Sequence, residues 1–322
     1  MASRPSISVV ICAYTEVRWR ELVAAVASAR RQTVAPLEVI VVVDHSPRLL
    51  ERARAELPKV IVVANHEPPG LSGARNSGVA VARGGVVAFL DDDAAAAPDW
   101  LEQLGAAYRD ERVLGVGGEI EPVWESARPR WFPAEFGWVV GCTFRGLPER
   151  TSVVRNPIGA NMSFRRELFE TVGGFRSGFG RVGTRPLGCE ETEWCIRAQR
   201  RRPDGVMLYE PRARVTHRVT ASRARWRYFT SRCYAEGMSK ALVAQVAGKR
   251  DALASERTYV VRTLPRGVAR AFADAGRGDP AGLARAGAIV VGVTITAAGY
   301  LIGRVRGVVD RSRARTAAPA HA

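Results

Sequence analysis

Four short runs of apolar, β-branched residues alternate with helical patterns along the first third of the chain. The runs cover residues 7–12, 38–43, 60–64 and 86–90, and helices are expected around residues 20–31, 51–57, 73–82 and 101–109. Strands that are joined by crossover helices form βαβ units, whose sheets are mostly parallel. The sequence therefore predicts an α/β fold with a doubly wound, mostly parallel sheet.

The rest of the chain divides into an irregular segment and a helical region. Residues 116–160 are rich in glycine, proline and tryptophan and show no clean period, so we expect them to cover the sheet without regular structure. Helices are expected at residues 165–171, 191–201 and 226–247, and a strand pair at 205–217. We therefore predict one domain in residues 1–225, with halves at 1–115 and 116–225, and a helical, partly apolar C-terminal extension in residues 226–322.

The most apolar stretch of the chain, residues 286–303, has about the minimum length that crosses a bilayer. Three alternatives are open: a membrane-spanning helix, a helix that lies on the membrane surface, or a helix that packs on its own protein. Arginines precede and follow the stretch, and both flanks would favour the cytoplasmic side, which disfavours a simple crossing. We therefore expect peripheral membrane attachment, with a single span as the alternative.

The chain is strongly basic, with 48 Lys+Arg against 32 Asp+Glu and a formal net charge of +16. Such a surface attracts polyanions, which include nucleic acid, anionic lipid headgroups and phosphorylated substrates. Basic residues beside the apolar stretch favour an anionic membrane surface over a nucleic-acid groove. The five cysteines show no paired metal spacing, and no secretory signal pattern opens the sequence, so we expect a cytoplasmic location.

Three consecutive carboxylates, Asp91, Asp92 and Asp93, follow the fourth apolar run. At the end of a buried strand they would repel one another unless solvent or a cation compensated their charge. Mg2+ and Mn2+ bind carboxylate oxygens and leave positions for substrate phosphates, so the triplet favours a metal and nucleotide site. Tyr14 and Asp44 follow other predicted strands and would reach the same edge of the sheet. The alternative is a solvated acidic loop or a cap of the next helix.

An ordered series of motifs covers about the first 220 residues, at positions 8–16, 39–44, 71–78, 89–93, 159–165 and 190–194. Through this series the chain resembles the family 2 glycosyltransferases, which carry the GT-A fold. The resemblance implies a metal-dependent, inverting transfer of a sugar from a nucleoside diphosphate sugar to a hydroxyl acceptor. It also implies that residues 1–115 bind the nucleotide sugar and that residues 116–225 face the acceptor.

The resemblance assigns the donor to polar groups at strand ends and in loops that enter helices. The first strand end would receive the base, the acid after the second strand would accept a hydrogen bond from a uracil-like N–H, and the loop before the third helix would meet the base or the diphosphate. The site would comprise Ala13, Tyr14, Glu16, Asp44, Arg75, Asn76, Asp91, Asp92 and Asn161. The structural alternatives are a turn residue at Asp44, a solvated helix face at Arg75 and Asn76, and a helix cap at Asn161.

The resemblance also assigns the metal and the general base. The Asp-x-Asp motif of the family falls on Asp91 and Asp93, which would hold Mg2+ or Mn2+, and a histidine that contacts the metal in some members falls on His217. A lone histidine is more often structural.

A general base must take the proton of the acceptor hydroxyl. Family members usually place an Asp after a Glu at the start of a helix, whereas the pair here is Glu190 and Glu191. The base position falls on Glu191, but the longer side chain leaves Glu190 and also Glu193 as candidates. The alternative is acidic charge that stabilises a helix N-terminus without catalysis.

The predicted function is a metal-dependent, inverting glycosyltransferase of cell-surface polysaccharide or glycolipid synthesis. Its acceptor would be a sugar, lipid-linked or polymeric hydroxyl at the inner face of the cell membrane, and no nucleic acid is expected as a partner. One alternative is a nucleotidyltransferase with the same metal site, although no triphosphate-binding loop follows the first strand. A second is an inactive sugar-nucleotide-binding module, because Glu191 stands where Asp is usual.

Overall fold

A computed structural model describes residues 4–181, 187–248 and 254–316. This part of the chain forms a nine-stranded sheet in the order β3-β2-β1-β4-β8-β6-β9-β5, with β7 paired to β9. The strands are β1 (Ile7–Ala13), β2 (Glu38–Val43), β3 (Ile61–Ala64), β4 (Val86–Asp91), β5 (Ala94–Ala96), β6 (Val113–Trp124), β7 (Ser152–Val154), β8 (Asn161–Arg165) and β9 (Val206–Val219). Strands β3, β2, β1 and β4 are parallel neighbours, whereas β8, β5 and β7 join the sheet antiparallel.

Helices cover both faces of the sheet, because successive strand residues point to opposite sides. Val9 and Ile11 of β1 share a core with α1 (Trp19–Arg30), α2 (Pro47–Glu56) and α4 (Trp100–Ala107). Val10 belongs to the opposite core, with α3 (Leu71–Val81), α5 (Glu167–Val172) and α6 (Glu190–Arg201). Burial on both faces explains the nearly continuous apolar runs of the sequence. The predicted α/β fold with a doubly wound sheet is confirmed.

Strands β6 and β8 correct two predictions. Residues 116–160 are not irregular throughout, since β6 reaches Trp124 and the helix predicted from residue 165 begins at Glu167, after β8. The glycines of β6 suggested irregular structure, but they are needed for close packing. A Cβ at Gly115 would overlap the ring of Phe164, and one at Gly118 would overlap the backbone of residue 213.

Strand β9 replaces the predicted strand pair at residues 205–217 and runs parallel to β6 along its length. Gly118 of β6 is paired with Glu210, and Ile120 with Val215, so residues 211–214 form a bulge in β9. Beyond the bulge, burial alternates along the strand, and His217 lies on the buried side opposite β5. The bulge therefore sets which side chains of β9 point into the molecule.

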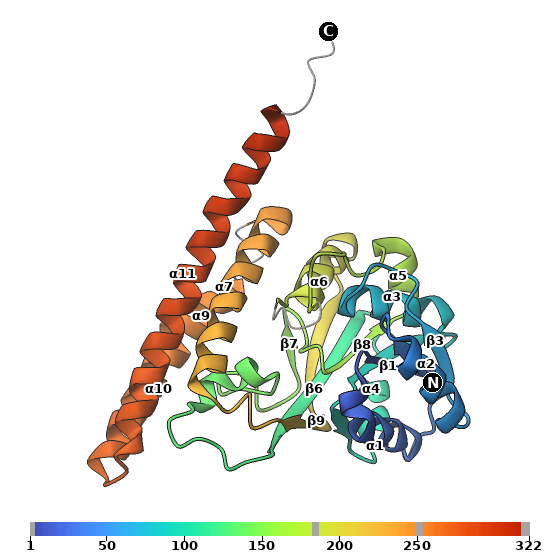
Figure 1. The fold of residues 1–322 in the computed structure, drawn as a ribbon, viewed down its shortest axis with the longest axis horizontal. Coiled ribbons are helices and arrows are strands. Elements are labelled where there is room, and N and C mark those ends of the chain that lie inside the picture. Colours follow the sequence, from blue (N-terminus) through green and yellow to red (C-terminus); the bar gives the residue numbers. More distant parts are fainter. Residues whose placement is uncertain (1–3, 182–186, 249–253, 317–322) are drawn as a thin grey trace.

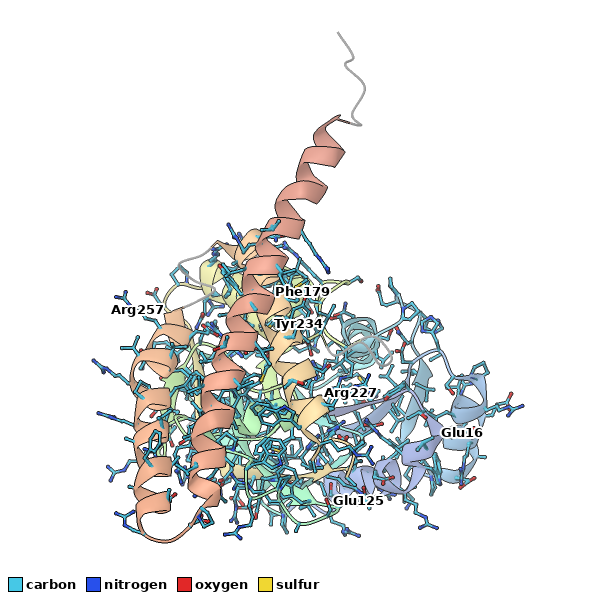
Figure 2. All side chains as sticks on the ribbon, turned by 60° about the vertical axis from the view of Figure 1, so that its left-hand side comes forward. Glu16, Glu125, Phe179, Arg227, Tyr234 and Arg257 are labelled. Carbon is cyan, nitrogen blue, oxygen red and sulfur yellow. The ribbon has the colours of Figure 1, made fainter. Side chains whose placement is uncertain are left out.

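The C-terminal helices stand beside the sheet as a separate layer (Figure 1). They are α7 (Trp226–Ala247), as predicted, then α9 (Ala254–Thr258), the π-helix η3 (Tyr259–Thr263), α10 (Leu264–Gly276) and α11 (Ala281–Thr316). Figure 2 shows α10 and α11 as an antiparallel pair. Whether residues 226–322 form a region separate from a domain at 1–225 stays a prediction.

Helix α11 contains a segment that is long and apolar enough to cross a membrane. Ala281–Arg306 has a mean hydropathy of 1.8 in its most apolar window, of which 33% is buried. One side of this segment packs closely on α7, since a Cβ at Gly299 would overlap the backbone oxygen of Tyr234. The other side exposes apolar residues such as Leu301 and Val305. Packing on its own protein therefore accounts for one face of the helix only.

Candidate active site

The carboxyl ends of β1, β2 and β4 border a large cavity. Its volume is about 890 Å³, and it extends from these strand ends past α6 to the C-terminal helices. Ala13, Tyr14, Asp44 and the three consecutive aspartates all line it. The structure thus brings together the side chains that the sequence placed at separate strand ends.

Asp91, Asp93 and His217 form a cluster at one end of this cavity. Strand β4 supplies Asp91, the turn after it supplies Asp93, and β9 supplies the histidine. One ligand atom from each of the three lies within 4.8 Å of the others. Carboxylate oxygens with one imidazole are a suitable donor set for a divalent cation.

Positive side chains balance the acidic triplet. Arg18 Nη1 lies 2.8 Å from Asp92 Oδ1 and 3.2 Å from Asp93 Oδ2, and Arg223 Nη2 lies 3.3 Å from Asp93 Oδ2. His217 Nε2 lies 3.1 Å from Asp93 Oδ1. Burial alone would raise the pKa of Asp93, but the charge and hydrogen bond of His217, with both arginines, lower it well below its ordinary range. Asp93 is therefore ionised at neutral pH.

Asp92 differs from its neighbour, although it is also buried. Burial, followed by the charge of Asp93, raises the pKa of Asp92 to about 7. Its Oδ2 is buried and has no hydrogen-bond partner among the residues that the structure describes. An orphaned carboxylate oxygen beside the cluster of Asp91, Asp93 and His217 is a feature that a bound cation with its water ligands would satisfy. The residues present therefore fit a divalent metal.

Glu190, the first residue of α6, is held by Arg75. Arg75 Nη1 lies 2.7 Å from Glu190 Oε1, and Arg75 Nη2 lies 3.5 Å from Asp91 Oδ1. The guanidinium also donates to the Gly159 carbonyl oxygen at 3.1 Å, and the Arg75 side chain is 2% exposed. Arg75 thus connects α3, α6 and the end of β4. The carboxylate of Glu190 forms a buried ion pair with Arg75.

Glu191 has a different environment on the same helix. It lines the cavity, and among the residues that the structure describes it forms no ion pair. Burial, followed by the charge of Glu190, raises the pKa of Glu191 to about 8. A carboxylate with a pKa near the operating pH is suited to general base catalysis.

The four residues that were predicted to contact the nucleotide base lie in different surroundings. Ala13 is buried at the end of β1, and the Tyr14 ring lies 5.4 Å from the Arg18 guanidinium. Asp44 accepts hydrogen bonds from Asn65 Nδ2 at 2.7 Å and from the backbone N–H of Gly70 at 2.9 Å. Glu16 is exposed in a short 3-10 helix, outside the cavity lining (Figure 2). Their donor contacts stay predictions.

Three predicted site residues are held by bonds within the protein. Asn161 lies in β8 and not at a helix cap; its side chain accepts from Trp100 Nε1 and donates to two backbone oxygens. Asn76 is bonded through both amide atoms to the backbone of Phe175. Glu193 is 1% exposed and pairs with Arg197. These bonds favour structural functions, and the ligand contacts of Asn161 and Asn76 and the base function of Glu193 stay predictions.

Comparisons with known proteins agree with this geometry. The model of glycosyl transferase family 2 matches residues 8–173. A glucosyl-dolichyl phosphate glucuronosyltransferase of Haloferax volcanii is 36% identical over 238 residues, which cover 73% of this chain and 76% of that protein. This chain belongs to glycosyltransferase family 2. The succinoglycan biosynthesis protein ExoM of Rhizobium meliloti is 25% identical to this glycosyltransferase over 239 residues, covering 72% and 73% of the two chains.

Solved structures share the fold of this glycosyltransferase. A mannosyltransferase from Pyrobaculum calidifontis, in complex with GDP-Man and Mn2+, has a TM-score of 0.58 at 20% identity, covering 96% of this chain and 88% of that one. GalNAc-T7 with UDP, GalNAc and Mn2+ has a TM-score of 0.52 at 19% identity, covering 79% and 54%. The GT-A fold of the family 2 enzyme is thereby confirmed.

Sequence reasoning did not single out several side chains of the site. Neither Arg18 nor Arg223 was predicted to lie there, yet both contact the acidic triplet. A charged network on α7 and α9, described below, was also missed. The spacing of Arg232, Glu236 and Lys240 at every fourth residue was the available signal, because such residues share one face of a helix.

Proposed function

We propose that this glycosyltransferase is metal-dependent and inverting, and that it transfers a sugar from a nucleoside diphosphate sugar to an acceptor hydroxyl. The observation that carries the proposal is that the cluster of Asp91, Asp93 and His217 and the carboxyl of Glu191 line one cavity. These are the two groups that a direct displacement requires: a site for the leaving diphosphate and a base for the acceptor.

Asp91, Asp93 and His217 would hold the cation. A bound divalent cation would offset the negative charge that develops on the departing diphosphate. Arg18, Arg75 and Arg223 would contribute further positive charge to the same end of the cavity, since each is already within 3.5 Å of a carboxylate there.

Glu191 would act on the acceptor side. As the acceptor oxygen forms its bond to the anomeric carbon, the bond from that carbon to the diphosphate oxygen breaks. The electron pair leaves with the diphosphate, and the acceptor proton passes to the Glu191 carboxylate. Glu190 would position Arg75 and would raise the basicity of Glu191 through its charge.

The acceptor is proposed to be a sugar hydroxyl in glycolipid or polysaccharide synthesis, at the inner face of the cell membrane. Support comes from the exposed apolar residues of α10 and α11, including Phe272, Leu283, Leu301 and Val305, and from the net charge of +16. The relative from Haloferax volcanii carries a dolichyl phosphate substrate in its name. Cell fractionation tests the location, and an enzyme that stays soluble and indifferent to anionic vesicles would contradict it.

The test of the reaction is nucleoside diphosphate release from a panel of UDP-, GDP- and dTDP-sugars with Mn2+ or Mg2+. The parent is compared with Asp93→Asn and Glu191→Gln. We expect slow hydrolysis of one donor, lost in EDTA and in Asp93→Asn. Donor binding without turnover under either metal would instead support the inactive-module alternative, and turnover of nucleoside triphosphates would support a nucleotidyltransferase.

A further inference from the structure

The cavity continues well beyond Glu191. Its far wall is formed by η2 (Ala134–Val140), η3, α7 and α11, and includes Trp138, Tyr259, Val293 and Ala297. Two further lining residues, Val260 and Leu301, are 43% and 64% exposed. The cavity therefore reaches the surface between η3 and α11, next to the exposed apolar face of α11.

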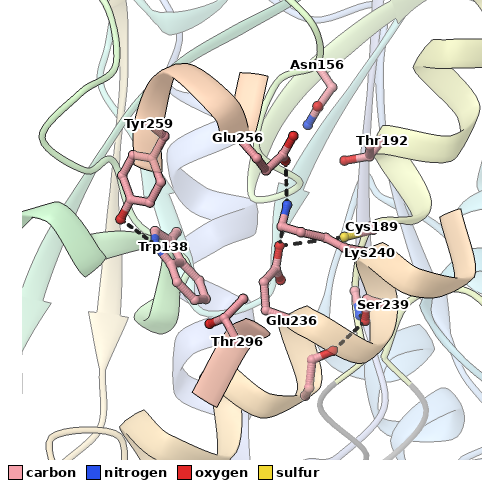
Figure 3. Close-up of polar contacts among 12 residues, drawn as sticks. Trp138, Asn156, Cys189, Thr192, Glu236, Ser239, Lys240, Glu256, Tyr259 and Thr296 are labelled. Carbon is pink, nitrogen blue, oxygen red and sulfur yellow. Dashed lines mark hydrogen bonds and ion pairs between the residues drawn. The ribbon is translucent and has the colours of Figure 1, made fainter. Parts of the chain in front are cut away.

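A charged network lies between Trp138 and Tyr259 of this wall and the start of α6, where Cys189 and Thr192 lie (Figure 3). Lys240 Nζ lies 3.0 Å from Glu236 Oε1, one turn earlier on α7, and 2.6 Å from Glu256 Oε1 on α9. Arg155, after β7, forms two hydrogen bonds to Glu256 at 2.7 and 2.9 Å. Arg232 Nη2 lies 3.7 Å from Glu236 Oε2. All five side chains line the cavity.

The network lies against the start of α6, where the proposed base is. The thiol of Cys189, two residues before Glu191, lies 3.7 Å from Glu236 Oε1. Figure 3 shows Cys189 and Thr192 of this segment facing Lys240. An acceptor whose hydroxyl reaches Glu191 would therefore extend over the network.

The network brings charged groups into a partly buried cavity wall. Among the described residues its members are the cations Arg155, Arg232 and Lys240 and the carboxylates of Glu236 and Glu256, and their side chains are only 11–18% exposed. Ion pairs removed from water are often no more stabilising than apolar residues of the same size, so packing of α7 on its neighbours does not require them. Guanidinium and ammonium groups in a cavity wall are suited to binding an anionic group, because each donates charge-assisted hydrogen bonds.

The cavity thus presents, in order, a base, a cationic layer and an apolar channel that opens beside α11. We infer that the acceptor is a glycolipid whose sugar is joined to an apolar chain through a phosphate: the sugar lies at Glu191, the phosphate at the network of Lys240 and Arg155, and the chain between η3 and α11. The inference rests on the proposed function, since it names the acceptor of the same site.

The test uses the full-length protein in mild detergent, with the donor that the panel identifies. Three acceptors carry the same sugar: one joined to a long alkyl chain through a phosphate, one joined to the same chain by a neutral ether, and one with the phosphate but only a methyl group. We expect kcat/KM for the first acceptor to exceed that for each of the others by about tenfold or more.

Two substitutions separate the contributions of charge and chain. Lys240→Met should reduce the preference for the phosphate-linked over the ether-linked acceptor about tenfold, and Lys240→Arg should restore it. Lys59→Met, at an exposed turn far from the cavity, is the matched control. Thermal unfolding identifies a Lys240 variant that fails to fold.

Ala297→Trp provides a second, independent test, because it fills the channel without touching the network. It should reduce transfer to the long-chain acceptor about tenfold relative to the methyl acceptor. Ala298→Trp, on the exposed side of the same helix and outside the cavity lining, should leave the ratio unchanged.

The outcomes separate the inference from the proposed function. If the parent releases nucleoside diphosphate but uses the three acceptors equally, the inference is wrong and the proposed function stands. Equal effects of Ala297→Trp and Ala298→Trp would overturn the channel. If the parent turns over no donor, the proposed function fails, and the inference fails with it.

Discussion

Glu190 and Glu191 are adjacent in α6, yet the structure predicts different effects for their substitution on the pH dependence of transfer. Burial and the charge of Glu190 raise the pKa of Glu191 to about 8. A general base must be ionised to accept a proton, so activity should rise with pH through this value. With a pKa of about 8, the ionised fraction is about 1% at pH 6 and about 50% at pH 8, which predicts a roughly fifty-fold rise in kcat/KM.

Glu191→Gln removes the base. Transfer should fall about 10²–10⁴-fold, and the rise between pH 6 and 8 should disappear. Glu190→Gln removes the neighbouring negative charge, so the pKa of Glu191 should fall and the rising limb should move to lower pH. The same change leaves Arg75 with Asp91 and the Gly159 carbonyl, so donor binding should weaken as well.

The assay is the initial rate of glycosylated product between pH 5.5 and 9, at limiting acceptor and saturating donor and metal. Glu167→Gln, an exposed acidic residue in the first turn of α5, is the matched control and should follow the parent. The reasoning is refuted if Glu191→Gln keeps the parent's rate and pH profile, or if Glu190→Gln moves the rising limb to higher pH.

Three further predictions concern the metal and the packing. Mn2+ at a concentration of one hundred times its Kd should raise the free energy of unfolding by about 2.7 kcal/mol in thermal scans. The Asp93→Asn variant should not show this stabilisation, and equal stabilisation of both proteins would contradict the metal site. Asn161→Ala removes the hydrogen-bond partner of Trp100 Nε1 and of two carbonyl oxygens. The free energy of unfolding, measured with urea, should therefore fall by about 3 kcal/mol. A fall below about 1 kcal/mol would refute the structural function of Asn161. Gly299→Leu should lose about 1–3 kcal/mol by overlap with Tyr234, whereas Ala298→Leu should not.

Local sequence patterns were sufficient to predict much of the fold. The strand at residues 38–43 and the helix at 226–247 were predicted with the bounds that the structure shows, because each depends on its own periodicity. Asp44 and Asp91 line the same cavity, as expected because the carboxyl ends of parallel strands lie at the same edge of the sheet.

Predictions failed where the deciding contacts are distant in sequence. Arg18 and Asp92 are 74 residues apart, and Arg223 and Asp93 are 130 residues apart, so no motif spacing reveals these pairs. The partners of Asn161 are also distant in sequence: its side chain is bonded to Trp100 and to the backbone of residues 119 and 213. An isolated turn sequence carries no information about such partners.

The bulge at residues 211–214 of β9 has a consequence for how this chain tolerates changes in length. Beyond it, pairing with β5 fixes His217 opposite Ala94, and a shift of one residue would turn the imidazole to the other face of the sheet. The carbonyl oxygens of Ala213 and Arg214 accept hydrogen bonds from Asn161 and Ala97, so a residue added or lost within the bulge can be taken up only before them. We therefore expect insertions and deletions in related chains, and tolerated ones in a library of variants, to fall at 211–212 and to be absent from 213–219.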